Sequence, residues 1–477
     1  MIRTIAYKEF LEMVRDGRAQ WAAGIVIALL LTALAVGWRN YEEINSERQL
    51  AQSTVREQWL RQPEQNPHSG VHFSTYAFKP RTFLSSIDPG LAPYVGATVW
   101  LEAHLQNQME ARPADDASAV QRFGQMTAAM VLQLLLPLLI ILVSFSVFAG
   151  EKERGTLRQL ISLGVKPSHL AAGKALGVAG ALALVLVPAA VIGVLALSLL
   201  TDLAAARLDL GRMLLMGGFY LLYLGLFIGL SLAVSAKARS SRLALVGLLG
   251  FWVFNGLIAP RVTSDIARTL YPNIPSFEFE GELVKAQNYG LDGTSTYDER
   301  RSKREKEVLE QYGVEKTKDL PVNFYGIQLQ MNEDFGYLAN DKFYGDLYEN
   351  FRRQNRVRDI GAVFAPLLAI RPLSMALSGT DWYQHQDFAE RAEMHRRLTV
   401  KIINDDITFN GIVDGVSLSN QYVNGIDIWE RVPPFKYQVK PVSWVLGNHR
   451  WNLVILLLWF ACAGVLLCWA TGRMEVE

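Results

Sequence analysis

Residues 21–38 read WAAGIVIALLLTALAVGW, an uncharged stretch that is long enough to cross a lipid bilayer. A transmembrane helix needs roughly 20 predominantly apolar residues, because the hydrocarbon core is about 30 Å thick. Five further stretches have the same character, at residues 128–150, 176–200, 213–236, 243–260 and 451–469. The sequence therefore predicts a polytopic α-helical membrane protein with six transmembrane helices.

The overall composition is a mixture of these apolar stretches and ordinary polar protein. Charged residues make up 19% of the 477 residues, and 47 Lys and Arg nearly balance 46 Asp and Glu. That balance argues against a nucleic-acid-binding protein, which works through a positive field. The two cysteines, Cys462 and Cys468, both lie in the sixth stretch, and their number excludes a disulfide scaffold and a four-cysteine metal site.

Basic residues indicate the orientation of the chain. They are concentrated before the first stretch, after the second and after the fourth, as is typical of cytoplasmic segments. The residues concerned are Arg3, Lys8, Arg15 and Arg18, then Lys152, Arg154, Arg158, Lys166 and Lys174, and finally Lys237, Arg239 and Arg242. Both termini are therefore predicted to be cytoplasmic. Residues 1–19 also place apolar side chains on one helical face, which predicts a helix on the cytoplasmic membrane surface; a solvated leader helix is the alternative.

The predicted order of segments follows from these spans and their orientation. It is an interfacial helix (1–19), span one (20–38), a first extracytoplasmic segment (39–125), span two (126–150), a cytoplasmic loop (151–174), span three (175–200), a short external loop (201–212), span four (213–236), a cytoplasmic loop (237–242), span five (243–260), a second extracytoplasmic segment (261–450), span six (451–470) and a cytoplasmic tail (471–477). The two extracytoplasmic segments exceed half of the chain, enough for a core of their own.

The external segments are predicted to form a large, mainly helical α+β domain. Residues 407–445 are rich in Val, Ile, Asn and Gly and look strand-like. Residues 361–377 are apolar, but Arg371 lies among them next to Pro372. A central arginine costs about 2.5–3.5 kcal/mol on insertion scales, so this segment is predicted to be a buried or interfacial helix pair outside the membrane.

The sequence carries no enzyme signature such as H-E-x-x-H or G-x-S-x-G. Residues 150–155 resemble the start of a phosphate loop, but the required Lys-Ser/Thr does not follow, so the chain has no ATPase motif of its own. His68 and His72 are four residues apart, although Pro67 and the intervening Ser-Gly make a helix there unlikely. We therefore expect hydrogen-bonded or surface histidines and no metal ligands; a metal site assembled from distant parts is the alternative.

Polar residues are sparse inside the predicted spans. Gln133 and Asn255 are the main candidates for a polar lining of a translocation path. The spans hold no buried acidic or basic residue, whereas ion-coupled carriers usually need one to relay protons or hold coupling ions. Two GxxxG pairs, at Gly173/Gly177 and Gly225/Gly229, predict close helix packing.

The cytoplasmic loop 151–174 reads EKERGTLRQLISLGVKPSHLAAGK. Thr156 and Gln159 have the spacing of a capping box, Gly164 can take the left-handed position after a helix, and Pro167 prevents continuation. The sequence thus predicts a short helix whose apolar face (Leu157, Leu160 and Ile161) docks into a groove on a cytoplasmic partner. A solvated loop is the alternative.

This loop resembles that of ABC-2-type permeases, the membrane subunits of type V ABC exporters, in its acidic E-x-E-x-G-T-L stretch and its later proline. The resemblance implies that a coupling helix here contacts a separate ABC ATPase, through Glu151, Glu153, Arg154, Gly155, Thr156, Leu157, Leu160 and Pro167. It also implies a cytoplasmic elbow helix before span one, marked by Lys8, Glu9, Phe10 and Arg15. ATP and Mg²⁺ would bind the partner and not this chain, and a second permease chain, identical or paralogous, would complete the path.

The enlarged extracytoplasmic segments depart from typical members of that family. Residues 72–96 and 367–381 are similar to a bacterial subgroup catalogued under a domain of unknown function. The resemblance implies a multi-pass subunit of the bacterial inner membrane that couples ATP hydrolysis to substrate export or translocation, with a possible periplasmic or substrate partner. The alternative is a mechanical transmitter that moves a periplasmic domain or partner without transport. A membrane-bound periplasmic enzyme ranks last.

Overall fold

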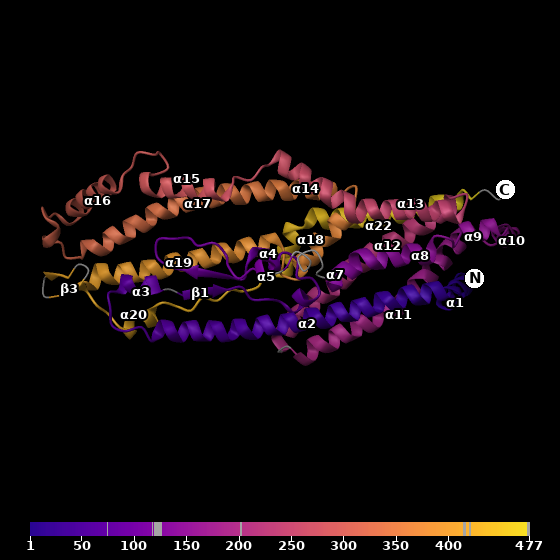
Figure 1. Ribbon diagram of the computed structural model, residues 1–477, viewed down its shortest axis with the longest axis horizontal. Helices are drawn as coiled ribbons and strands as arrows, with labels where there is room; N and C mark the ends of the chain where they lie inside the picture. Colours follow the sequence, from indigo (N-terminus) through magenta and orange to yellow (C-terminus); the bar gives the residue numbers. More distant parts are fainter. Residues whose placement is uncertain are drawn as a thin grey trace.

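The computed structural model describes residues 1–73, 75–116, 118, 126–200, 203–413, 416–418 and 421–474. The molecule is elongated (Figure 1), with a helical bundle at one end and long helices that extend away from it at the other. Both chain termini lie at the outer end of the bundle, next to α9 (Ala149–Glu153) and α10 (Thr156–Ser162). We call this the terminal end of the bundle, and the part beyond the bundle the distal part.

Six helices in the described residues are long and apolar enough to span a membrane, as the sequence predicts. They cover Gly17–Leu60, Ala128–Glu153, Pro167–Leu195, Asp209–Lys237, Ser241–Leu270 and Arg450–Gly472. Four of these spans are single elements: α2 (Gly17–Leu60), α11 (Pro167–Leu200), α12 (Leu203–Lys237) and α22 (Arg450–Gly472). The second span consists of α7 (Ala128–Met130), the π-helical turn η2 (Val131–Leu135), α8 (Leu136–Ser144) and α9. The fifth consists of α13 (Ser241–Val253), the π-helical turn η3 (Phe254–Ile258) and α14 (Ala259–Leu270).

Several of these helices extend beyond the limits that hydropathy predicts; span five, for example, continues past residue 260 to Leu270. Helix α2 continues past residue 38 to Leu60 and enters the distal part (Figure 1). Residues 203–212, predicted as a loop, form the first turns of α12, because their Leu, Ala and Arg are strong helix formers. Some residues of the predicted segments lie outside the described residues: 74, 117 and 119–125 of the predicted first extracytoplasmic segment, 201–202 of that predicted loop, 414–415 and 419–420 of the predicted second extracytoplasmic segment, and 475–477 of the predicted tail.

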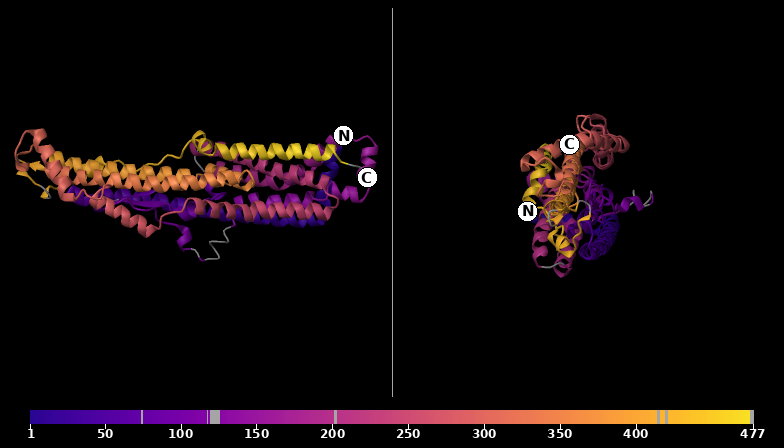
Figure 2. Two further views of the ribbon diagram at one scale, coloured as in Figure 1. Left: turned by 90° about the horizontal axis from the view of Figure 1, so that it is seen from above. Right: turned by 90° about the vertical axis from the view of Figure 1, so that its left-hand side faces the viewer.

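The distal part is built mainly from helices, of which the long α17 (Phe324–Gly361) and α19 (Trp382–Asn410) run in the same direction as the extension of α2 (Figure 1); Figure 2 shows the elongated shape from two further sides. The other helices are α3 (Pro67–Phe73), α4 (Ala92–Val95), α5 (Pro113–Asp116), α15 (Ser276–Tyr289), α16 (Tyr297–Tyr312), α20 (Ile426–Arg431) and α21 (Val442–Asn448), with short 3₁₀ turns η1 (Phe83–Ser86) and η4 (Thr317–Asp319). Two antiparallel pairs of strands accompany them: β1 (Thr75–Phe78) with β2 (Thr98–Leu101), and β3 (Ile412–Val413) with β4 (Val416–Ser417).

The prediction that residues 407–445 are strand-like is wrong for most of the described part of that range. Helix α19 continues to Asn410, and only β3 and β4 follow before α20 and α21. The reason is tertiary: Ile403 and Ile407 lie one helical turn apart and both are buried. Their burial on one face extends the helix through residues whose local preference is for strands.

Residues 361–377 form one buried helix instead of the predicted helix pair. Helix α18 (Leu367–Leu377) begins after Pro366, which disfavours a helical conformation in the residue before it, so residues 362–365 form a turn. All residues of α18 except Arg371 are buried, and the helix packs against α12, α17 and α22. Its Leu367, Leu368 and Ile370 belong to the same hydrophobic core as the bundle. Helix α18 therefore closes the bundle on its distal side.

The histidines that were not expected on a helix do lie on one. Helix α3 places His68 and His72 one turn apart. Pro67 is its first residue, a position where the missing N–H is harmless, and Asn66 Oδ1 accepts the N–H of His68 at 3.0 Å. The proline that argued against a helix therefore begins it.

Candidate functional site

The helix predicted in the 151–174 loop is present as α10, at the terminal end of the bundle (Figure 1). Its C-terminal end has the predicted form: Gly164 has φ +82, and its N–H donates to Ile161 O at 2.9 Å while Val165 N–H donates to Leu160 O at 3.2 Å. The two bonds make a Schellman motif. Pro167 is the first residue of α11, where it fits without cost.

The predicted capping box at Thr156 and Gln159 does not form. Gly155, with φ +72, precedes the helix, and Thr156 is already its first helical residue. The Thr156 hydroxyl donates to Glu151 O at 3.3 Å, which joins α10 to the end of α9. Gly155 acts as a left-handed joint between the two short helices, a conformation that costs other residues more.

The apolar face of α10 packs against the bundle and is more buried than a surface that docks a partner would be. Leu157 is buried in the core of the bundle, and Leu160 and Ile161 are half-buried against the same core. The prediction that these three side chains present an exposed apolar face is therefore wrong. The outer surface of α10 is formed by other residues, among them the exposed Arg154, Arg158, Gln159 and Leu163.

A buried ionic cluster lies where α9 packs against its neighbouring helices. Lys174 Nζ donates to Glu9 Oε1 at 2.6 Å, to Glu151 Oε1 at 2.8 Å and to Val147 O at 3.2 Å. Glu9, Glu151 and Lys174 are each at most 4% exposed, and the half-exposed Lys8 lies 3.1 Å from Glu9 Oε1 and 3.2 Å from Glu151 Oε1. Two carboxylates thus meet two ammonium groups, the balance that buried charges need.

This cluster, which we call the Lys174 cluster, joins three helices from separate parts of the sequence. Glu9 and Lys8 lie on α1 (Ile2–Arg15), Glu151 on α9 and Lys174 on α11. Burial alone would lower the pKa of Lys8, but its hydrogen bond to Glu12 and the Glu9 and Glu151 carboxylates raise that pKa above its ordinary value. Lys8 therefore stays charged. The first helix, the end of span two and the start of span three are held at one point.

Close packing reinforces the contact between α1 and α11. A methyl group added at Gly173 would lie 2.6 Å from Ile5 Cβ, and one at Gly177 would lie 2.5 Å from Glu9 Cβ. Phe10 also faces α11, because its ring would lie 3.4 Å from a methyl group at Gly180. The first GxxxG pair therefore serves to seat α1. Arg15 is exposed in the last turn of α1 and does not join the cluster.

Glu153 connects the same loop to span five. Its Oε1 accepts the backbone N–H of Ser241 at 2.9 Å, and its Oε2 accepts the Ser241 hydroxyl at 2.7 Å. Ser241 is the first residue of α13, so Glu153 satisfies a donor at a helix N-terminus. Lys152 Nζ donates to Ala236 O at the end of α12. The two short loops at this end of the bundle are therefore linked to each other.

Gln133 and Asn255, predicted to line a path, are buried and each sits in a π-helical turn. Such a turn leaves a carbonyl without its helical partner. Tyr223 donates its hydroxyl to Gln133 O at 2.9 Å, and Trp252 Nε1 donates to Leu134 O at 2.9 Å. Neighbouring helices thus satisfy the backbone of η2.

The side chains of these two residues attach α18 to the bundle. Gln133 Nε2 donates to the Tyr220 hydroxyl at 2.9 Å, which lies 2.8 Å from Ser374 Oγ on α18. Asn255 Oδ1 accepts the N–H of Leu367, the first residue of α18, at 2.9 Å. Ser374 in turn donates to Asp88 Oδ2 at 2.5 Å. The network therefore connects spans two, four and five with both segments of the distal part.

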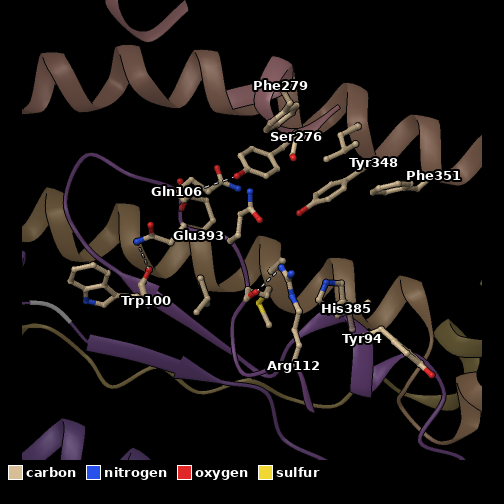
Figure 3. A pocket seen from close by; sticks show the side chains of 18 of the residues that line it. Tyr94, Trp100, Gln106, Arg112, Ser276, Phe279, Tyr348, Phe351, His385 and Glu393 are labelled. Carbon is tan, nitrogen blue, oxygen red and sulfur yellow. Dashed lines mark hydrogen bonds between the residues drawn. The ribbon is translucent and has the colours of Figure 1, made fainter. Parts of the chain in front are cut away.

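The distal part contains a cavity of about 400 Å³ (Figure 3). Its walls come from the β2 region and from α15, α17 and α19. Figure 3 shows the aromatic rings of Phe279 and Tyr348 on one side and Arg112, His385 and Glu393 on the other. Burial, with Lys79 and Arg112 nearby, lowers the pKa of His385 to about 3, so this ring is neutral. The cavity combines aromatic walls with a few polar groups, as binding sites for small molecules do.

Several of these residues were not predicted. In the sequence, Lys174 stands out only as one of the basic residues of a predicted cytoplasmic segment, and nothing singles out Tyr220, Ser374 or Asp88. A lysine two residues before an uncharged apolar stretch is a signal that could have identified Lys174 as a group in need of a partner. No local signal marks Ser374 or Asp88, because their partners are distant in the sequence.

Comparison with known proteins agrees with this architecture. The family model described as "ABC-2 family transporter protein" matches residues 3–355. None of the curated proteins compared with the chain matches it. The matched residues include α1, the Lys174 cluster, α10 and five of the six membrane-spanning helices. Together with six apolar helices, the match shows that this membrane-embedded chain belongs to the ABC-2 family of transporter proteins, as a permease.

Proposed function

We propose that this chain is the membrane subunit of a bacterial ABC transporter, which couples ATP hydrolysis on a separate ABC ATPase to export or translocation of a substrate. The terminal end of the bundle would be cytoplasmic and the distal part periplasmic, as the distribution of basic residues favours. ATP and Mg²⁺ would bind the ATPase subunit, since this chain has no phosphate-binding motif.

The Lys174 cluster is the observation that carries this proposal. It places α10, the exposed short helix between spans two and three, on a rigid base formed by α1, α9 and α11. A force that the ATPase applies to α10 would therefore reach spans two and three through buried charged contacts. Glu153 would pass the same displacement to span five.

The contact with the ATPase would use the outer surface of α10. Gly155, Thr156 and Arg154 are exposed there, together with Arg158 and Leu163. Four other residues would support α10 without touching the ATPase, because each contacts another part of this chain: Glu151, Glu153, Leu157 and Leu160. Pro167 starts the helix that receives the displacement. In this proposal the residues of the loop divide between those that contact the ATPase and those that support α10 from within the chain.

A second permease chain would complete the transport path, because six spans form only half of a usual ABC channel. The Gly225/Gly229 pair is not available for that interface. A methyl group added at Gly225 would lie 2.7 Å from the Phe460 ring, and one at Gly229 would lie 3.2 Å from Ala463 O. Both glycines therefore face α22 of the same chain.

A mechanical transmitter is the second candidate, and helix α2 favours it. This helix runs without a break from Gly17 to Leu60, through the bundle and into the distal part (Figure 1). Tilting of its membrane portion would therefore move the distal part directly. In that case a periplasmic partner would respond, and no substrate would cross the membrane.

Purification of the chain with its ATPase tests the proposal. Leu163 is 79% exposed on α10 and Leu50 is 70% exposed on the distal portion of α2. We expect Leu163→Asp and Arg158→Glu to abolish recovery of the ATPase with the membrane subunit, while Leu50→Asp leaves it unchanged. Recovery of the ATPase with both α10 variants would overturn the docking assignment, and a stable complex that never contains an ATPase would overturn the proposed function.

Transport by reconstituted vesicles separates the two candidates. If the chain transports, ATP-dependent movement of a substrate will require the α10 contact. If it transmits motion, ATP hydrolysis will change the protease sensitivity of the distal part without solute movement.

A further inference from the structure

Three histidines from two parts of the chain meet in the distal part. His68 and His72 lie on α3, and His104 lies on the loop after β2. One ring nitrogen of each lies within 4.8 Å of the corresponding nitrogen of the other two, and the ring centroids are 5.0–5.1 Å apart. His68 is buried, whereas His72 is exposed and the His104 side chain is 34% exposed.

The contacts of His68 determine which of its nitrogens carries the proton. Asn404 Nδ2 donates to Gln330 Oε1 at 3.1 Å, which turns Asn404 Oδ1 toward the His68 ring. That oxygen lies 3.3 Å from His68 Nδ1. An amide oxygen only accepts, so Nδ1 must be the donor. The neutral ring then has its lone pair on Nε2.

His104 is oriented in the same way by a carboxylate. Glu333 Oε1 lies 2.5 Å from His104 Nδ1 and also accepts the backbone N–H of His104 at 3.0 Å. A carboxylate oxygen beside Nδ1 favours a proton on that nitrogen, and an imidazole protonated only there has its lone pair on Nε2.

These two lone pairs point at one another across a short distance. His68 Nε2 and His104 Nε2 are 3.2 Å apart. Two lone pairs at that distance repel each other unless a proton or a metal ion lies between them. Tetrahedral Zn²⁺ with Zn–N distances of about 2.0–2.1 Å holds its nitrogens about 3.3 Å apart, which the observed separation matches.

We propose that His68, His72 and His104 bind a divalent transition-metal ion of the Zn²⁺ class, with His68 and His104 coordinating through Nε2. Three imidazoles with a carboxylate and an amide oxygen behind them form the usual arrangement of a histidine metal site. Three protein ligands leave at least one coordination position open to solvent or a further ligand, in keeping with the exposure of His72.

The supporting groups are rigidly held, which a preformed site requires. Arg396 is buried and donates to both oxygens of Glu393 at 2.8 Å, and its Nη1 lies 3.5 Å from Glu333 Oε2. His104 itself has φ +68, a left-handed conformation that is strained for a residue with a side chain. The two Glu333 contacts hold it there. Strain of this kind is concentrated at functional sites.

The site would also connect the two segments of the distal part. All three ligands come from residues 67–104, whereas Glu333 lies on α17 and Asn404 and Arg396 lie on α19. Arg396 and Glu393 line the cavity of Figure 3 as well. A bound ion would therefore stabilise α3 and the β2 loop against these helices and place a positive charge near that cavity.

Metal titration of the full-length protein in detergent, purified without a histidine tag and treated with a chelator, tests the proposal. We expect Zn²⁺ to bind at one ion per chain and to be displaced by competition with a chromophoric chelator. Co²⁺ should give the visible absorption bands of a tetrahedral or five-coordinate nitrogen site. Replacing His72 and His104 together by Ala should remove both signals.

Two further variants separate coordination from general effects on folding. Glu333→Gln keeps all three ligands but weakens the orientation of His104, so we expect Zn²⁺ affinity to fall about 10–100-fold. His169→Ala removes a histidine at the other end of the molecule and should change nothing. Circular dichroism of the metal-free variants checks that each is folded.

The outcomes that would overturn the proposal are equally specific. Wild-type protein that binds no more Zn²⁺ than the His72→Ala/His104→Ala variant would show that the two Nε2 atoms share a proton instead of a metal ion. Zn²⁺ binding that His169→Ala removes would place the site elsewhere. A Co²⁺ spectrum of the octahedral, oxygen-coordinated type would exclude the three imidazoles as ligands.

Discussion

Lys174 Nζ lies 2.6 Å from Glu9 Oε1, although the two residues are 165 positions apart in the chain and both side chains are at most 4% exposed. Each charge is removed from water, and each therefore depends on the other for its stability. The contact fixes the N-terminal helix against span three at the end of the bundle where α10 is exposed.

Removing the lysine should leave two buried carboxylates without their main partner. We expect Lys174→Met to lower the free energy of unfolding by about 3–5 kcal/mol, which will appear as poor accumulation in the membrane or a large fall in thermal stability in detergent. Lys166→Met replaces an exposed lysine of the same loop and should have almost no effect.

The double variant Lys174→Met/Glu9→Gln also removes the charge of one of these two carboxylates. We expect it to recover part of the lost stability, because fewer charges then remain buried. Equal stability of Lys174→Met and wild type would contradict the buried position of the cluster.

The seat of α1 on α11 depends on the absence of a side chain at Gly177. A methyl group there would lie 2.5 Å from Glu9 Cβ and 2.9 Å from Ala6 O. We expect Gly177→Ala to displace α1, to cost about 1–3 kcal/mol and to increase trypsin cleavage after Lys8 and Arg15. Gly247→Ala, in α13, has no neighbouring atom within 4 Å and should be neutral or slightly stabilising. Identical cleavage patterns for the two variants would argue against this packing.

The attachment of α18 should depend on Ser374. Its hydroxyl bridges Asp88 and Tyr220, so Ser374→Ala leaves two buried oxygens with a missing partner. We expect a loss of about 1–3 kcal/mol in thermal unfolding experiments. Ser46→Ala removes an exposed hydroxyl that bonds only to Glu43 O in the same helix, and we expect no measurable change. If both serine variants unfold alike, the network does not hold α18.

Lys79 predicts a rise in stability with pH in the alkaline range. Burial lowers its pKa to about 8 from an ordinary value of 10.5, although Asp381 opposes the shift. The folded protein thus releases this proton at a lower pH than the unfolded chain does. Between about pH 8 and about pH 9.5 the unfolded chain binds more protons, so the free energy of unfolding increases with pH.

Thermal unfolding of wild type and Lys79→Met across that range measures the effect. The upper pH limit of this experiment stays below the ordinary pKa of tyrosine. Above that pKa, buried tyrosines ionise more readily in the unfolded chain than in the folded protein, and this lowers the free energy of unfolding. We expect the wild-type midpoint to rise and the Lys79→Met midpoint to stay nearly constant. Parallel slopes would show that another group is responsible.

The sequence by itself determined the membrane part of this protein. An uncharged stretch of about 20 apolar residues has no stable alternative to a spanning helix, so hydropathy predicted six spans. Local backbone chemistry also predicted where α10 ends, because Gly164 and Pro167 act on their immediate neighbours. The family resemblance depended on the same short loop, and the match over residues 3–355 confirmed it.

Only the tertiary structure decided what surrounds the individual side chains. Leu157 had the pattern of an exposed docking face and is buried, and the amide of Gln133 is bonded to Tyr220. The partner of Lys174 is 165 residues away, and that of Ser374 is 286 residues away. No local pattern encodes such pairings, because burial and charge balance are set when distant helices pack together. The three histidines, separated in sequence and adjacent in space, illustrate the same limit.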